Sequence, residues 1–135
     1  MLLLTLPVGC GSEFPLADVS GVVTLDGEPL SNATVFFQPV QSSSNPVVGP
    51  PSIGVTDESG RYSVSTHKLG SGAVVGTHEV SISTFETRMK DPENSDALEV
   101  VSQERVPQRY RAPSELNFEV TSRGTDSADF SLTSS

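Results

Sequence analysis

The sequence is poor in several residue types on which common protein classes depend. It has one cysteine and no tryptophan, and 17 acidic residues outnumber 8 Lys and Arg to give a formal net charge of −9. A single cysteine cannot form a disulfide within the chain. An acidic surface repels phosphate backbones, so we expect no nucleic-acid partner. Two Tyr and six Phe are the only aromatic residues, which disfavours a sugar-stacking surface.

The residues that are abundant favour strands and turns. Ser and Thr are frequent, and Gly and Pro contribute 11 and 10 residues, a composition typical of β-proteins with many turns. The 135 residues have room for one domain. A seven-strand β-sandwich needs about 100 residues, so the length suffices. The core must then come mainly from Val, Leu, Ile and Phe.

The single cysteine has an informative position. Cys10 closes a short apolar run over residues 1–9 and is followed by Gly11 and Ser12. This arrangement resembles a bacterial lipoprotein signal peptide, which implies cleavage before Cys10, lipidation of its thiol, a membrane partner through the lipid, and a place in the cell envelope outside the cytoplasm. Residues 11–17 are polar and predict a tether. The alternative is an apolar N-terminal segment with an ordinary buried cysteine.

Alternation of apolar and polar residues begins after Asp18 and predicts half-buried strands. The predicted strands cover residues 19–25, 33–39, 52–56, 61–65, 77–84, 116–120 and 128–132. Alternation fits antiparallel sheets packed face to face, and the short connections leave no room for the helical crossovers of a parallel sheet. We therefore expect an all-β fold, a seven-strand antiparallel β-sandwich over residues 18–133. No other apolar run approaches the roughly 20 residues that a membrane-spanning helix needs.

The connections between these strands differ in character. Residues 122–126 contain a glycine and predict a hairpin loop between the last two strands. Residues 40–51 are rich in Ser, Pro and Asn and predict a surface loop. Within the charged stretch 85–114, the roughly helical spacing of Leu98 and Val101 predicts a short helix over residues 94–104.

Three motifs resemble one family. They are Val19-x-Gly21-x-Val23-x-Leu25-Asp26-Gly27-x-Pro29, then Thr56-Asp57-x-x-Gly60-x-Tyr62, and finally Val106-Pro107-x-x-Tyr110. Together they resemble the carboxypeptidase regulatory-like domain, in the small lipoprotein version of planctomycete-type bacteria. The resemblance covers most of residues 18–133. It implies a prealbumin-like (transthyretin-like) or Ig-like Greek-key sandwich, and it implies no active site.

The motif residues have structural roles in this interpretation. Asp26 and Gly27 form a tight turn in which Gly27 supplies a positive φ, and Pro29 stiffens the loop that follows. Asp57 accepts hydrogen bonds from backbone N–H groups just after it, and Gly60 takes the left-handed conformation. In the next strand, Tyr62 places its ring in the core with its hydroxyl near the rim.

Candidate catalytic and metal-binding residues are few. His67 and His78 have no cysteine or carboxylate at a metal-ligand spacing. His78 shares a strand face with Val80 and Ile82, which predicts a residue at the rim of the core. Ser71 lies between two glycines and lacks the GxSxG context of a nucleophile elbow. We expect no metal, no cofactor and no enzymatic activity.

The sequence therefore predicts a non-catalytic, envelope-anchored domain with a structural or interaction role, whose partner is an envelope protein or polysaccharide. The alternative is a carbohydrate- or peptide-binding module that uses the end loops 40–51 and 86–114, because fold alone does not decide function.

A local basic group, Arg105, Arg109 and Arg111, offers a contact for an acidic partner. Alternatively, its members pair with the nearby Glu104 and Glu115 as surface ion pairs.

Overall fold

The computed structural model describes residues 14–41, 49–91 and 94–134. Cys10, the first part of the predicted tether and most of the loop 40–51 lie outside the described residues. The strands are β1 (Leu16–Ala17), β2 (Ser20–Leu25), β3 (Glu28–Pro29), β4 (Thr34–Pro39), β5 (Ser52–Val55), β6 (Arg61–Ser63), β7 (Ser65–Thr66), β8 (Gly70–Ser71), β9 (Ala73–Val74), β10 (Gly76–Ser83), β11 (Glu86–Asp91), β12 (Asn94–Ser102), β13 (Leu116–Val120) and β14 (Phe130–Leu132), with one 3-10 turn, η1 (Gln108–Tyr110). Within these ranges no helix is long and apolar enough to cross a membrane.

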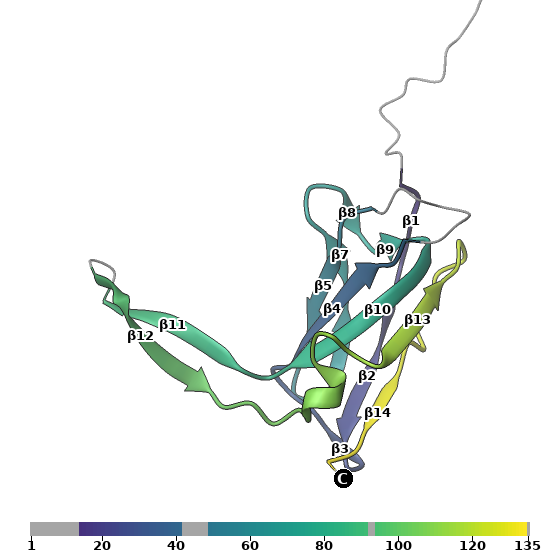
Figure 1. Ribbon diagram of the computed structural model, residues 1–135. Coiled ribbons are helices and arrows are strands. Elements are labelled where there is room, and N and C mark those ends of the chain that lie inside the picture. Colours follow the sequence, from purple (N-terminus) through teal and green to yellow (C-terminus); the bar gives the residue numbers. More distant parts are fainter. Residues whose placement is uncertain (1–13, 42–48, 92–93, 135) are drawn as a thin grey trace, which may run out of the picture.

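The fold is a β-sandwich, as predicted (Figure 1). One sheet has the order β13-β10-β4-β5-β7-β8, and the facing sheet has the order β14-β2-β3, with β6 also paired to β2. The seven predicted strands correspond to β2, β4, β5, β6, β10, β13 and β14. Every pairing between named strands is antiparallel except that of β14, which runs parallel to β2.

The core lies between the two sheets, and the alternation of the sequence shows which side chains enter it. In β4, Val35 and Phe37 are fully buried, whereas the residues between and beside them are partly exposed. Phe37 is at the centre, with the rings of four other residues within 6.5 Å of its own. These rings belong to Tyr62, His78, Phe118 and Phe130. Edge-on and tilted ring pairs of this kind add to the energy of burial.

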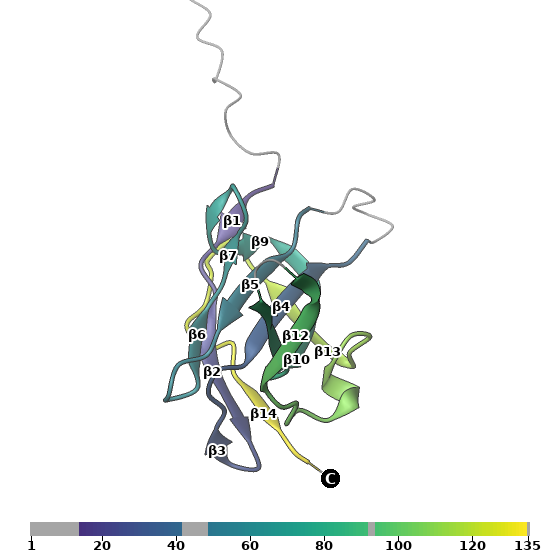
Figure 2. The same ribbon diagram turned by 90° about the vertical axis from the view of Figure 1, so that its left-hand side faces the viewer.

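One extended segment serves both sheets. In β6, Ser63 pairs with Ser20 of the smaller sheet, and two residues later in β7, Ser65 pairs with Ile53 of the larger one. The residue between them, Val64, is buried and donates its N–H to the Val19 carbonyl at 3.1 Å. Figure 2 shows β6 beside β2 and β7 beside β5. This segment therefore joins the two sheets along one border of the sandwich.

The predicted helix over residues 94–104 is wrong. Residues 94–102 form β12, which pairs antiparallel with β11. We name this hairpin, residues 86–102, the β-arm; Figure 1 shows it projecting from the sandwich. Two neighbouring valines, Val100 and Val101, lower helix propensity and raise strand propensity. An isolated short helix is only marginally stable in water. As a strand, the same segment forms backbone hydrogen bonds with β11.

The last connection also differs from the prediction. Residues 122–126 are not a hairpin loop, because β13 and β14 belong to different sheets. The segment crosses from one sheet to the other. Two backbone hydrogen bonds hold it beside the start of β2, Thr125 N–H to the Asp18 carbonyl at 2.8 Å and Ser20 N–H to the Thr125 carbonyl at 3.0 Å.

The predicted tether of residues 11–17 ends in ordered structure. Leu16 and Ala17 form β1 and pair with Val74 and Ala73 of β9. Ala17 is buried in the core. The folded body therefore includes residues that precede Asp18.

Candidate functional site

The turn between β5 and β6 is held by one carboxylate. Asp57 Oδ1 accepts the backbone N–H of Ser59 at 2.8 Å and of Arg61 at 3.0 Å. The Asp57 carbonyl accepts the N–H of Gly60 at 2.9 Å. Gly60 has φ +77°, and its own carbonyl accepts the Val23 N–H at 2.8 Å. A side chain at Gly60 would meet the Val23 carbonyl, so glycine is required both for its φ and for the approach to β2.

The tyrosine after this turn is committed to the core. Tyr62 is buried, and its hydroxyl donates to the Ala128 carbonyl at 2.6 Å. Burial raises the pKa of the Tyr62 hydroxyl, and the negative charge of Asp129 adds to the effect. The hydroxyl therefore remains a hydrogen-bond donor that ties β6 to the segment before β14. Gly21 allows this close approach, because a side chain there would overlap the Ala128 backbone.

The turn after β2 has the conformation that its sequence favours. Asp26 and Gly27 both have positive φ, +53° and +85°, which is typical of a two-residue type I′ hairpin turn. Asp26 Oδ1 also accepts the Ser134 N–H at 2.9 Å, and hydrogen bonds to Ser134 lower the pKa of this carboxyl. The turn thus fastens the end of the described chain to the start of the sandwich.

Pro29 lies in β3 rather than in a loop. It pairs with Thr24, and the next hydrogen bond of this hairpin is donated by Leu30 to the Val23 carbonyl at 3.0 Å. In an antiparallel pair, alternate residues point their N–H groups away from the neighbouring strand. Pro29 occupies such a position at the edge of the smaller sheet, where its missing N–H costs no ladder hydrogen bond.

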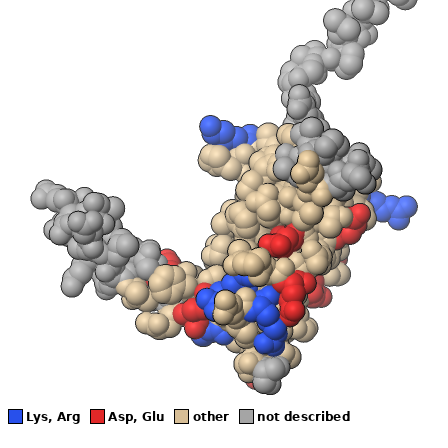
Figure 3. Space-filling model, viewed as in Figure 1, with Lys and Arg blue, Asp and Glu red and all other residues tan. Residues whose placement is uncertain are grey.

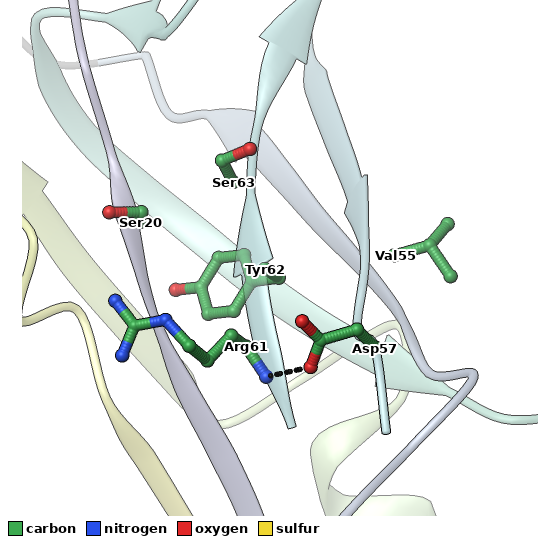
Figure 4. A pocket seen from close by; sticks show the side chains of 6 residues that line it. All are labelled: Ser20, Val55, Asp57, Arg61, Tyr62 and Ser63. Atoms are coloured by element: carbon green, nitrogen blue, oxygen red, sulfur yellow. Dashed lines mark hydrogen bonds between the residues drawn. The ribbon is translucent and has the colours of Figure 1, made fainter. Parts of the chain in front are cut away.

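An open groove runs beside β6 and β7. One part, of about 360 Å³, is lined by the six residues drawn in Figure 4, Ser20, Val55, Asp57, Arg61, Tyr62 and Ser63. A second part, of about 370 Å³, shares Ser20 and Ser63 and adds Asp18, Val19, Val64, Ser65 and Ser71. We call both parts together the serine groove.

The serine groove is polar and shallow. Four serines, Ser20, Ser63, Ser65 and Ser71, line it together with one guanidinium, that of Arg61. None of the described residues that line it is His, Cys or Lys. A serine nucleophile needs an adjacent base; the acidic lining residues are the carboxylates Asp18 and Asp57, and Asp57 already accepts two backbone hydrogen bonds of its own turn. The arrangement instead offers hydroxyl groups and one cation to a polar ligand.

Of the two histidines, His67 is exposed and His78 is completely buried. The prediction that His78 lies at the rim of the core is therefore wrong, because its ring packs edge-on against Phe37 at 5.5 Å. Its Nε2 lies 2.6 Å from the Val74 carbonyl, so Nε2 carries the proton, while Nδ1 has no hydrogen-bond partner of good geometry in the described chain. Burial lowers the pKa of His78, and the Val74 and Phe37 carbonyls and the Glu119 charge oppose this. No group of three or more potential metal ligands occurs among the described residues.

The basic group around η1 is tied to its surroundings. Arg105 donates to the Ser31 carbonyl at 2.8 Å. Arg109 lies 3.6 Å from the carboxylate of Glu115 and stacks on the ring of Tyr110 at 4.6 Å. In Figure 3, acidic side chains lie beside basic ones over this region. The nitrogen Nε of Arg111 is buried without a described partner.

Sequence reasoning missed the role of Glu104. Its Oε1 accepts the N–H of Thr84 at 2.9 Å and of Val106 at 3.1 Å, and its Oε2 accepts the hydroxyl of Ser83. Burial acts to raise the pKa of Glu104, but the hydrogen bonds from Ser83, Thr84 and Val106 outweigh it and lower the pKa. Ser83 and Thr84 precede the β-arm and Val106 follows it, so this carboxylate closes the base of the arm. We name it the Glu104 clamp.

Comparisons with known proteins add little to this geometry. No family model matches the chain, and no curated protein matches it. Among solved structures, one similar chain is a 9R-lipoxygenase from Cyanothece PCC8801, with 13% sequence identity and a TM-score of 0.38. The match covers 88% of this chain and 16% of the lipoxygenase chain. A likeness this low carries no argument about function.

Proposed function

We propose that this protein is a non-catalytic β-sandwich of the carboxypeptidase regulatory-like type, held at the cell envelope by a lipid on Cys10, with a structural or interaction role. The hydrogen bonds of the motif residues support the non-catalytic part of this proposal. Asp57 bonds to its own turn, Asp26 to Ser134 and Tyr62 to Ala128. These hydrogen bonds stabilise the fold, and they occupy the Asp57 carboxylate and the Tyr62 hydroxyl although both residues also line the serine groove.

The envelope location is supported by the sequence around Cys10. The apolar run before it and the polar residues after it match the order of a lipoprotein signal and tether. The first strand, β1, begins at Leu16, six residues after Cys10. A lipid on Cys10 would therefore hold the sandwich close to a membrane, with the strand β1 as its first attachment to the sheets.

Metabolic labelling with a palmitate analogue tests the anchor. The full chain should take up label and fractionate with membranes, and Cys10→Ala should lose both properties. Ser12→Ala, two residues further on, is the matched control and should keep the label. Equal labelling of the Cys10→Ala variant, or no labelling of the unaltered chain, would reject the anchor.

A second candidate function is binding of a carbohydrate or peptide, and the serine groove favours it. One part of the groove is lined by Ser20, Ser63 and Arg61, and the other part adds Ser65; polar groups of this kind give a pocket its specificity. The expected result on a glycan array is binding by the full chain that Arg61→Ala abolishes. Arg105→Ala, in the basic group around η1 and not among the groove-lining residues, should leave it unchanged. A blank array for the full chain would count against this candidate.

A further inference from the structure

The β-arm is a hairpin with unsatisfied edges. β11 pairs only with β12, and the other edge of each strand has no partner strand in the part of the chain that the structure describes. Figure 1 shows the arm extending away from both sheets of the sandwich. A two-stranded hairpin alone is marginally stable in water, and an unpaired edge is a template for another strand. The arm therefore needs a further strand to be a stable element.

We propose that this strand is β12 of a second copy. The two β12 strands pair antiparallel around a two-fold axis at Leu98 and form a four-stranded sheet, β11-β12 of one copy followed by β12-β11 of the other. This inference rests on the interaction role in the proposed function and names the partner. A two-fold pairing of identical strands is closed, so it gives a dimer and not a filament.

The charges of β12 fit this pairing. With Leu98 on the axis, Asp96 lies opposite Val100 and Glu99 opposite Ala97 of the other copy, while the uncharged ends 94–95 and 101–102 face each other. No two like charges are directly opposite. Like charges directly opposite destabilise a strand pair, so a pairing centred on Leu98 avoids this penalty. The register of β12 with β11 shifts between Glu86 and Thr87 and between Met89 and Asp91, so the pairing is centred on the stretch beside Leu98 and does not need the whole strand.

The charges of β11 disfavour the same arrangement. Pairing all six residues of β11 with a second β11 places Glu86 opposite Asp91. Shifting the pairing by one residue places Arg88 opposite either itself or Lys90. Every alignment that joins at least five of its residues therefore carries a like-charge pair. The edge available for self-pairing is that of β12.

One exposed residue of β12 gives a test of this pairing. Val100 in β12 is 48% exposed in the single chain, so substitutions there do not disturb a buried core. Substitutions of Val100 can place a negative or a positive charge opposite Asp96 of the other copy without altering the sandwich.

The first experiment uses a pair of variants of opposite charge at Val100. Val100→Glu places a second carboxylate opposite Asp96 at two symmetric positions, whereas Val100→Lys places a cation there. In the full chain with Cys10→Ala, so that no lipid contributes, sedimentation should show a dimer. The dimer of Val100→Glu should dissociate at a concentration about tenfold higher than the dimer of Val100→Lys, because two like-charge pairs disfavour the first dimer and two opposite-charge pairs favour the second.

Circular dichroism should show the same strand content in both variants, since Val100 lies outside the sandwich. A monomer of the Cys10→Ala chain with Val100 intact, at concentrations of a few hundred micromolar, would overturn the proposal. Equal dimerisation of Val100→Glu and Val100→Lys would also overturn it, because the dimer would then use another surface.

A second experiment locates the axis. Opposite residues of an antiparallel pair have Cα atoms about 4.5 or 5.5 Å apart, within the range that a disulfide spans. Leu98→Cys should therefore form a disulfide-linked dimer under mild oxidation. Ser95→Cys is the matched control, because the two copies of residue 95 are separated by six residues of strand, roughly 20 Å. Linkage of Ser95→Cys as efficient as that of Leu98→Cys would reject the axis.

These results are independent of the anchor. Loss of label in Cys10→Ala tests the envelope location, and the Val100 and Leu98 variants test the partner in a background without that cysteine. A chain that is labelled but monomeric would keep the proposed function and remove the inference about β12.

Discussion

The sandwich and the β-arm are both made of antiparallel strands, but different forces hold them. In the sandwich, β4 and β10 pair on both sides and bury one face completely, as at Val35, Phe37, Val80 and Ile82. In the β-arm each strand has one described neighbour. Burial dominates the first region and local pairing the second. The difference shows why the same chain has a firmly specified body and a hairpin that is held by the pairing of its own two strands.

The Glu104 clamp separates the two regions. It binds backbone and hydroxyl groups from the segments that enter and leave the arm, Thr84 and Val106. The last buried residue before the arm is Thr84. Phe85, directly after it, is 51% exposed. The border between buried and solvent-exposed residues thus falls at the Glu104 carboxylate. Substitutions in the sandwich should therefore lower the free energy of unfolding much more than substitutions in the β-arm.

The largest effect is expected in the centre of the sandwich. Phe37→Ala should lower the free energy of unfolding by about 3–5 kcal/mol, because it leaves a cavity among four other rings. Phe118→Ala should cost less, because Phe118 is only partly buried. Chemical denaturation measures both. A cost below about 1 kcal/mol for Phe37→Ala would contradict the central position of this ring.

At the border, Glu104→Gln should cost about 1–3 kcal/mol, because buried donors lose a charged acceptor. The pKa of Glu104 is lowered in the fold, so its contribution is present above the ordinary value of 4.5 and disappears as pH falls through the lowered pKa. Denaturation at pH 7 and pH 3 should therefore show a smaller difference between variant and parent at pH 3. Glu115→Gln, at an exposed ion pair with Arg109, is the control and should cost less than about 1 kcal/mol.

A pH dependence of smaller size belongs to the sandwich alone. The pKa of His78 is lowered below 6.5 in the fold, so the unfolded chain binds the proton first and stability falls as pH drops below 6.5. One proton gives a slope of at most about 1.4 kcal/mol per pH unit. His78→Phe should remove this slope between pH 7 and 5.5, and His67→Gln, on the surface, should retain it. If the free energy of unfolding of His78→Phe fell with pH as steeply as that of the parent, the pH dependence would belong to another group.

The smallest effect is expected in the β-arm. Val100→Ala removes a half-exposed side chain, so at concentrations where the protein is monomeric it should change the free energy of unfolding by less than about 0.5 kcal/mol. Denaturation beside Phe37→Ala measures the contrast between the two regions directly. A cost above about 1.5 kcal/mol would mean that the arm is packed into the body.

The sandwich was predictable from the sequence because every second side chain of a half-buried strand lies in the core, and this leaves an alternation of apolar and polar residues. Val35 and Phe37, or Val80 and Ile82, share a buried face and have more exposed neighbours, so the period of the strand is visible in the residues. Burial depth was less visible. His78 falls on the predicted face, but only the surrounding rings show that it lies at the centre.

The β-arm and the Glu104 clamp were not predictable in the same way. Leu98 and Val101 are three residues apart, a spacing that fits one face of a helix, whereas the strand in this segment depends on pairing with β11. Glu104 meets Ser83 and Thr84 only after β11 and β12 have paired, about 20 positions later in the chain. Contacts of this kind depend on tertiary structure, and the residue types alone carry no sign of them.

The segment over residues 61–66 has a consequence for how this protein comes apart. Because this segment supplies Ser63 to one sheet and Ser65 to the other, unpairing it from one sheet also weakens the pairing of the other sheet. The sandwich should therefore open as a single foldon. The amide hydrogens of β2 and β5 should exchange with solvent at the same global free energy, whereas those of the β-arm exchange by local fraying.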